Sequence, residues 1–204
     1  MTQETIARVR IYLNDIESKI WRLVEIPVTG SLKMLHDVIQ AAMGWHDYHL
    51  WHFEVDERRY GVPNPEWPDR NLGAARNMKL GTLIDRDVRQ FNYTYDMGDD
   101  WRHTVVVETV ELGEHGTKYP RFVTGEGRCP PEDIGGLPGF ERFLHALTDV
   151  AHEEHQHLRD WYGGPFDPNE IDELAAKRKV ALIAIRRHAG KVAYEKSRTL
   201  DQRG

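Results

Sequence analysis

Alternation of apolar and polar positions predicts two strands at the start of the chain. Residues 5–13 place apolar side chains at every second position, a spacing that is typical of a half-buried strand. The positions on the apolar face are Ala7, Val9, Ile11 and Leu13. Residues 19–27 predict a second strand that Pro27 ends, because proline has no N–H for a ladder. The short segment between them predicts a hairpin.

A change to three- and four-residue spacing then predicts an amphipathic helix. Its apolar positions are Leu32, Leu35, Val38, Ile39 and Ala42. Ser31 is a suitable N-cap, because its hydroxyl can accept a hydrogen bond from a free N–H of the first turn. Gly44 suits the position after the last turn, where the left-handed conformation is common.

The middle of the chain predicts further strands. Residues 49–55 and 58–61 fit short strands, whereas 62–73 are rich in Pro and Asn and predict a loop. Aromatic and aliphatic side chains alternate through 88–95 and 101–110, so these two segments are expected to form a hairpin closed by five residues. After Glu111 the chain is rich in Gly and Pro up to Gly139 and predicts a long loop.

The last third predicts helices, at 140–147, at 153–161, and from Pro168 to Ala189. Gly190 is expected to end the last helix and to leave residues 191–204 as a frayed, charged tail. Clustered strands followed by helices predict an α+β fold with a mainly antiparallel sheet. One helix follows the first hairpin, a helical segment closes the chain, and residues 1–190 form a single domain.

Composition narrows the class of protein. The 204 residues include one cysteine, Cys129, so an intramolecular disulfide is excluded. The longest apolar run covers residues 180–185, far short of the roughly 20 that span a membrane, so no membrane association is expected. The start of the chain lacks a signal-peptide pattern, and we predict a cytoplasmic protein.

The acidic net charge of −6 is unevenly distributed. Residues 176–204 hold nine Lys or Arg and two acidic residues, a net charge of +7, whereas residues 1–175 hold 18 basic and 31 acidic side chains, a net charge of −13. The basic segment predicts a solubilising helix, and a weak nucleic-acid contact is the alternative. Its candidate contacts are Lys177, Lys179, Arg186, Arg187 and Lys191.

Two acidic segments are the candidate sites. A turn carrying Asp96, Asp99 and Asp100, with nearby His103, could hold a divalent cation, since hard cations prefer carboxylate oxygens. Glu132 and Asp133 in a Pro- and Gly-rich loop complete the candidate cluster. The competing interpretation, which we favour, is a tight hairpin turn in which Asp caps the backbone and Trp101 packs inward.

The histidines give weaker signals. His46, His49 and His52 lie among aromatic residues and are interpreted as structural. Three further metal candidates occur together as His152, His155 and His157. Their spacing does not match the zincin pattern of ligands four residues apart, so a solvated helix is favoured. The chain lacks a Gly-Lys-Ser/Thr phosphate loop, and no histidine near Cys129 in the sequence offers a base.

Several segments together resemble the plasmid pRiA4b ORF-3-like family. They are Ile20-Trp21-Arg22, the helix from Leu32 to Trp45, His49-Leu50 with Phe53, Tyr95 to His103, Cys129 to Gly136, His152 with Glu154-His155, and Trp161, Gly163 and Phe166-Asp167-Pro168. Met97 stands where the family usually has Phe. Ile134 replaces a Cys of some members, which weakens a metal site built on Cys129. The resemblance implies an α+β domain found on plasmids, in transposons and in bacterial genomes, with some relatives labelled as resolvases or transposon passenger proteins.

Resolvase chemistry is not supported by the residues. The chain's three serines are Ser18, Ser31 and Ser197, which fall in a hairpin, at a cap and in the tail, and none of its histidines has Arg three residues later. The favoured hypothesis is a non-enzymatic binding or accessory module of mobile-element origin. The alternative is a metal-dependent hydrolase or nuclease that uses the Asp96 turn with nearby histidines. No cofactor is predicted apart from a divalent metal for this alternative, and the sequence does not identify a ligand or partner.

Overall fold

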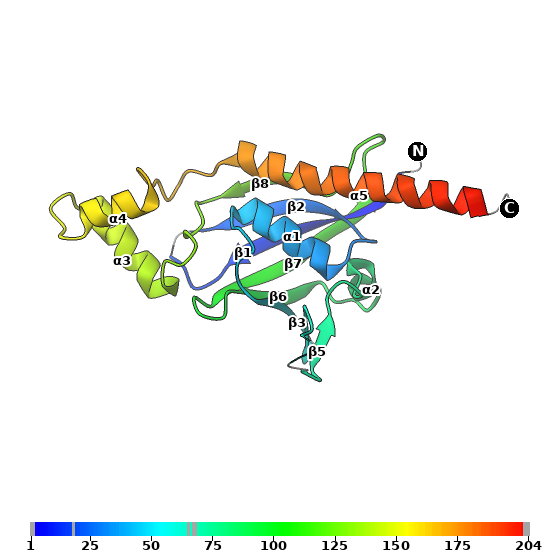
Figure 1. Ribbon diagram of the computed structural model, residues 1–204, viewed down its shortest axis with the longest axis horizontal. Helices are drawn as coiled ribbons and strands as arrows, with labels where there is room; N and C mark the ends of the chain where they lie inside the picture. Colours follow the sequence, from blue (N-terminus) through cyan, green and yellow to red (C-terminus); the bar gives the residue numbers. More distant parts are fainter. Residues whose placement is uncertain (1–2, 18, 65, 67–68, 202–204) are drawn as a thin grey trace.

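The fold centres on one eight-stranded sheet (Figure 1). The computed structural model describes residues 3–17, 19–64, 66 and 69–201. The strand order is β5-β4-β3-β6-β7-β1-β2-β8, and all neighbours are antiparallel except β4 and β5. The strands are β1 (Thr5–Leu13), β2 (Trp21–Pro27), β3 (Trp51–Val55), β4 (Arg58–Gly61), β5 (Leu72–Ala74), β6 (Gln90–Tyr95), β7 (Trp101–Leu112) and β8 (Arg121–Glu126). The predicted α+β class with a mainly antiparallel sheet is confirmed.

Both predicted hairpins are present. β1 pairs with β2 from Ile6↔Pro27 to Tyr12↔Trp21, and β6 pairs with β7 from Gln90↔Val106 to Tyr95↔Trp101. β1 also pairs with β7, so the first strand of the chain lies in the interior of the sheet. Trp101 is only 3% exposed at the base of its hairpin, as the alternation of apolar residues predicts.

Helix α1 (Leu32–Met43) crosses the sheet near β1 and β2 (Figure 1). The Ser31 hydroxyl accepts a hydrogen bond from the Met34 N–H at 3.3 Å, and Gly44 ends the helix with a φ of 100°. Four apolar side chains of this helix are fully buried: Leu32, Leu35, Val38 and Ile39. The sequence prediction of α1 and both its caps is therefore confirmed.

Three helices follow the sheet. Helices α3 (Gly136–Thr148) and α4 (His155–Tyr162) lie together beyond one end of the sheet, and α5 (Glu173–Asp201) returns along β8 and beside α1 (Figure 1). Rings from α3, α4 and the following loop form an aromatic cluster made of Phe140, Phe143, Tyr162 and Phe166.

The predicted limits of α5 are wrong at both ends. Asp167 accepts a hydrogen bond from the Asn169 N–H at 2.9 Å and forms a local turn, and Asp172 instead caps the helix by accepting from the Ala175 N–H at 2.8 Å. The helix also continues through Gly190 to Asp201, so residues 191–201 are helical where a frayed tail was expected. A single interior glycine costs only about 1 kcal/mol. Residues 202–204 of that predicted tail lie outside the described residues.

Three elements of the structure were not predicted from the sequence: α2 (Leu80–Asp85), β5 and β8. For β8 the reason is Gly125, which breaks the alternating pattern. A Cβ at Gly125 would lie 2.7 Å from the Trp21 carbonyl oxygen and 2.8 Å from Cδ of Arg22. The glycine is therefore needed where this strand passes the Arg22 side chain of β2, and a Gly in a strand can mark such a close approach.

Candidate functional site

The turn between β6 and β7 is built by Asp96. Its φ is 57°, a left-handed conformation that Asp tolerates better than most residues. Asp96 Oδ1 accepts hydrogen bonds from the N–H groups of Gly98 at 2.8 Å and Asp99 at 3.3 Å, and the Asp96 N–H donates to the Leu50 carbonyl at 2.9 Å. One oxygen of this buried carboxylate therefore holds the turn, while Oδ2 points elsewhere.

Three carboxylates converge on one histidine nitrogen beside this turn. Nε2 of His49 lies 3.0 Å from Asp133 Oδ1, 3.5 Å from Asp96 Oδ2 and 4.0 Å from Glu132 Oε2. His49 lies in the loop before β3, Asp96 directly after β6, and the other two acids in the loop before α3. His49, Asp96, Glu132 and Asp133 are hereafter called the His49 cluster.

The position of Glu132 is fixed by neighbouring groups. Its Oε1 accepts hydrogen bonds from the His46 N–H at 2.7 Å and the Tyr95 hydroxyl at 3.0 Å. Burial and then the adjacent Glu132 charge raise the pKa of Tyr95 above its ordinary value, so this hydroxyl stays protonated and donates. Glu132 is therefore preorganised, with Oε2 left on the side of His49.

The His49 cluster has the composition of a cation site. Nε2 of His49 is shielded from solvent and has no hydrogen-bond partner of acceptable geometry among the described residues. Across the same residues, no Lys or Arg pairs with any of its three carboxylates. Ligand atoms of His49, Asp96 and Asp133 lie within 4.8 Å of one another. One imidazole with two or three carboxylates suits Zn²⁺ or Mn²⁺.

The predicted cluster is only partly assembled. Asp99 Oδ2 accepts from the Gly135 N–H at 3.2 Å, and Asp100 pairs with Arg102 at 3.3 Å, so both carboxylates are used elsewhere. His103 is fully buried and its Nδ1–H donates to the Tyr93 carbonyl at 3.2 Å. Burial lowers the pKa of His103 to about 4, so this ring is a neutral part of the core.

The histidines near α4 are not brought together as ligands. His152 Nδ1 accepts from the Glu154 N–H at 3.1 Å, and His155 Nδ1–H donates to the Ala146 carbonyl at 2.9 Å. His157 is exposed. In the described part of the chain, ligand atoms of His and carboxylate residues gather in two places, at His36 and at His49. None of the three histidines near α4 belongs to either group.

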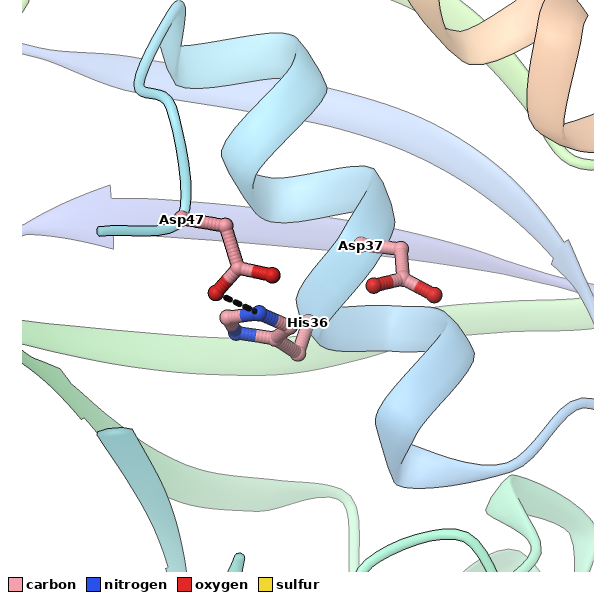
Figure 2. Close-up of side chains that lie close together, drawn as sticks. All are labelled: His36, Asp37 and Asp47. Carbon is pink, nitrogen blue, oxygen red and sulfur yellow. Dashed lines mark hydrogen bonds and ion pairs between the residues drawn. The ribbon is translucent and has the colours of Figure 1, made fainter. Parts of the chain in front are cut away.

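A second group of potential ligands is His36, Asp37 and Asp47 (Figure 2). Gln40 donates to the Tyr93 hydroxyl at 3.1 Å, which leaves the hydroxyl hydrogen for Nδ1 of His36 at 2.8 Å. The opposite nitrogen, Nε2–H, then donates to Asp47 Oδ1 at 2.8 Å.

The two carboxylates of this second group already lie next to a cationic side chain, that of Lys33. Lys33 Nζ lies 2.5 Å from Asp37 and 3.7 Å from Asp47. Burial, then the nearby Lys33 charge, lowers the pKa of His36 to about 2, so the ring is neutral and both its nitrogens are hydrogen-bonded. We interpret this network as an anchor that fixes the loop after α1.

The five predicted nucleic-acid contacts all lie on α5 but differ in their surroundings. Lys177 pairs with Glu173, and Lys191 with Glu4. Arg187, predicted as a candidate contact, is already paired, because both its terminal nitrogens bond to the Glu4 carboxylate, at 2.8 and 2.7 Å. Lys179 and Arg186 line a groove between α1 and α5.

Comparisons with known proteins give a family and no activity. The sequence model of the plasmid pRiA4b ORF-3-like protein family matches residues 5–175. The uncharacterized protein y4hQ of Sinorhizobium fredii (strain NBRC 101917 / NGR234) is 36% identical over 183 residues, which cover 85% of this chain and 94% of that protein. The crystal structure of a protein of unknown function, MM3350 from Methanosarcina mazei Go1, is similar with a TM-score of 0.78 and 31% identity, covering 88% of this chain and 99% of that one.

The helices are also informative about membranes. No helix in the described part of the chain is both long enough and apolar enough to cross a bilayer.

Proposed function

The chain belongs to the plasmid pRiA4b ORF-3-like family, and we propose that it is a non-catalytic accessory module that binds a divalent cation at the His49 cluster. The plasmid in the family's description supports a role connected with a mobile element. A cytoplasmic location stays a prediction.

One observation carries the proposal. Three carboxylates face a histidine nitrogen that lacks a well-aligned hydrogen bond, and the described residues supply no Lys or Arg counter-charge. Carboxylates with oxygens within 4.8 Å of each other, as in Asp96 and Asp133, repel each other, and the repulsion grows as water is excluded. A divalent cation bound to Nε2 and the carboxylate oxygens would remove that repulsion and satisfy the histidine.

The alternative is a metal-dependent hydrolase. The observation in its favour is that the Asp133 side chain is 66% exposed, so one side of the His49 cluster opens to solvent. Catalytic metal sites keep a position for water or substrate, which a site of this kind could provide. Cation-dependent hydrolysis of a phosphate ester by the full chain, lost in His49→Ala, would favour the enzyme over the binding module.

Calorimetric titration of the full, metal-stripped chain with Zn²⁺, Mn²⁺ and Mg²⁺ tests the cation site. We expect one equivalent of Zn²⁺ or Mn²⁺ to bind and to raise the unfolding temperature, since a ligand at 100 times its Kd stabilises by about 2.7 kcal/mol. His49→Ala and Asp133→Asn should each weaken binding at least about tenfold, because each loses one ligand. Asn tolerates the φ of 57° at position 133, so the loop is kept.

His152→Ala is the matched control, because it removes a histidine that lies outside the His49 cluster. It should bind the cation as the unaltered chain does. A titration without heat or thermal shift for any of the three ions contradicts the proposal, and so does an equal loss in His49→Ala and His152→Ala.

A further inference from the structure

A groove of about 670 Å³ lies between α1 and α5, on the side of the molecule that carries the loop after α1. Apolar side chains from both helices contribute to its lining, among them Met34 and Ala41 from α1 and Leu182 and Ile183 from α5. His46, whose backbone N–H holds Glu132, lines it as well. The groove is thus next to the His49 cluster but separate from it.

The charge of this groove is opposite to that of the whole protein. Five basic side chains from three parts of the fold line it: Lys33, Arg76, Lys179, Arg186 and Arg187. Two acidic side chains, Asp37 and Asp47, also line it, which leaves a net charge of +3 within a chain of net charge −6. A concave surface of one charge sign attracts ligands of the other sign.

Three of these cations are available for a ligand. Arg76 and Arg186 have no hydrogen-bond or ion-pair partner within the described part of the chain, and Lys179 reaches only the Gly44 carbonyl, at 3.4 Å. Lys33 and Arg187 are instead held by Asp37 and Glu4. Arginine presents paired N–H groups that match the oxygens of a phosphate, so two unpaired arginines in one groove favour a phosphate-bearing ligand.

Exposed aromatic rings continue from the same groove. The ring centroid of His46 lies 5.3 Å from that of Tyr48, and Tyr48 is 71% exposed, which is unusual for a large aromatic side chain. Basic grooves that continue into exposed rings are how proteins bind single strands, because unpaired bases stack on the rings while the phosphates follow the cations. Bases within a duplex are already stacked on each other and are not free to do so.

We propose that the α1–α5 groove binds single-stranded nucleic acid, with Arg76, Lys179 and Arg186 on the phosphates and the His46–Tyr48 ring pair under a base. The proposal rests on charge and exposed rings and is independent of the cation site. Binding measurements in EDTA keep the two proposals separate, because EDTA removes the cation without changing the groove.

Fluorescence anisotropy tests whether the groove binds a single strand. The full chain is titrated against a labelled 12-nucleotide single strand at 50 and 200 mM salt. With about three phosphates neutralised, affinity should fall about 10- to 20-fold between the two salt concentrations. Arg186→Ala should weaken binding about fivefold or more and reduce the salt dependence. Arg178→Ala removes the same charge from the same helix outside the groove and should change the affinity less than twofold.

Tyr48→Ala should weaken binding at least about fivefold, the effect of losing one stacked base, whereas Tyr12→Ala, which removes a 41% exposed ring elsewhere, should not. Competition with a duplex and with a mononucleotide identifies the ligand. Absence of binding at 50 mM salt, equal losses in Arg178→Ala and Arg186→Ala, or equal affinity for the duplex or the mononucleotide would each overturn the proposal. Unchanged circular dichroism melts confirm that the variants are folded.

Discussion

Aspartate has a distinct conformational role in this protein. All seven non-glycine residues with positive φ in the described ranges are aspartates: Asp15, Asp47, Asp56, Asp87, Asp96, Asp100 and Asp133. The short side chain can bond to nearby backbone N–H groups and so offsets the strain of this conformation. Asp96 and Asp133 of the His49 cluster therefore have two roles, and replacement by Asn removes the charge while keeping the turn.

Burial of Trp101 gives the first stability prediction. Trp101 is 3% exposed and stacks near Trp45, with ring centroids 6.3 Å apart. Trp101→Ala should lower the free energy of unfolding by about 3–5 kcal/mol, the usual range for a buried large aromatic residue. Urea denaturation measures it, with Trp161→Ala, a 46% exposed tryptophan, expected to lose less. A loss below about 1 kcal/mol for Trp101→Ala would contradict the structural interpretation of the turn.

Buried His103 should make the fold sensitive to acid. Because burial lowers the pKa of His103 to about 4, the folded protein keeps this ring neutral while the unfolded chain takes up a proton below about pH 6.5. Its contribution to stability is thus fully present above pH 6.5 and is lost as the pH falls toward 4, by up to about 1.4 kcal/mol per pH unit.

Replacement of His103 isolates that effect. His103→Leu should flatten the dependence of the unfolding free energy on pH between 6.5 and 4, and the exposed His115→Leu should leave it unchanged. Urea denaturation at four pH values measures both. Identical slopes for His103→Leu and the unaltered chain would show that the ring takes up protons equally in both states.

At the scale of elements, regular patterns were predicted well and mixed ones were not. The strands β1 and β2 and the helix α1 follow from uninterrupted periodicity and clear caps. β8 was missed because Gly125 gives space to Arg22, a requirement set by a strand about 100 residues away. The start of α5 was misplaced because local capping by Asp172 competes with Pro168, and nothing in the local pattern decides between them. Its end was misplaced because Gly190 lies inside the helix and does not stop it.

The candidate site shows the same limit. Asp96, Glu132 and Asp133 were predicted as one cluster, but His49 was interpreted as structural. It is brought to them by the pairing of β3 with β6, in which Trp51 lies opposite Tyr95 and the Leu50 carbonyl meets the Asp96 N–H. Aligning the two predicted strands in this register would have placed His49 beside Asp96. The strand pairing, which sequence spacing does not provide, was the missing information.

The attachment of α5 to the sheet gives a prediction about ion pairs. Arg187 makes two hydrogen bonds to Glu4 and one to the Thr29 hydroxyl at 3.1 Å, and its side chain is 11% exposed. Arg187→Ala should lower the unfolding free energy by about 1–3 kcal/mol, since hydrogen bonds between shielded charges are stronger than average. Lys191→Ala removes a 48% exposed partner of the same carboxylate and should cost less than about 1 kcal/mol. Equal costs in urea denaturation would contradict the anchoring role.

At the scale of the whole molecule, stability should differ between the sheet and the helical end. Helices α3 and α4 contact chiefly each other and share the aromatic cluster, whereas α1 packs on the sheet and on α5. Regions with few contacts to the main core open more readily. Hydrogen exchange should therefore be at least about tenfold faster in α3 and α4 than in α1, the matched helix, and slowest in β1 and β7. Equal protection of all three helices would show that the molecule opens as one unit.

The interior position of β1 sets an order of events during synthesis. A ribosome makes β1 and β2 before β7, and their hairpin forms from residues close in sequence, but one edge of β1 is left open because its partner there is β7. That partner is complete only when Leu112 has left the exit tunnel. Until then the nascent chain exposes an unpaired apolar strand, which is a template for joining to another chain. Chaperone demand should therefore be greatest in the interval between the synthesis of β2 and that of β7.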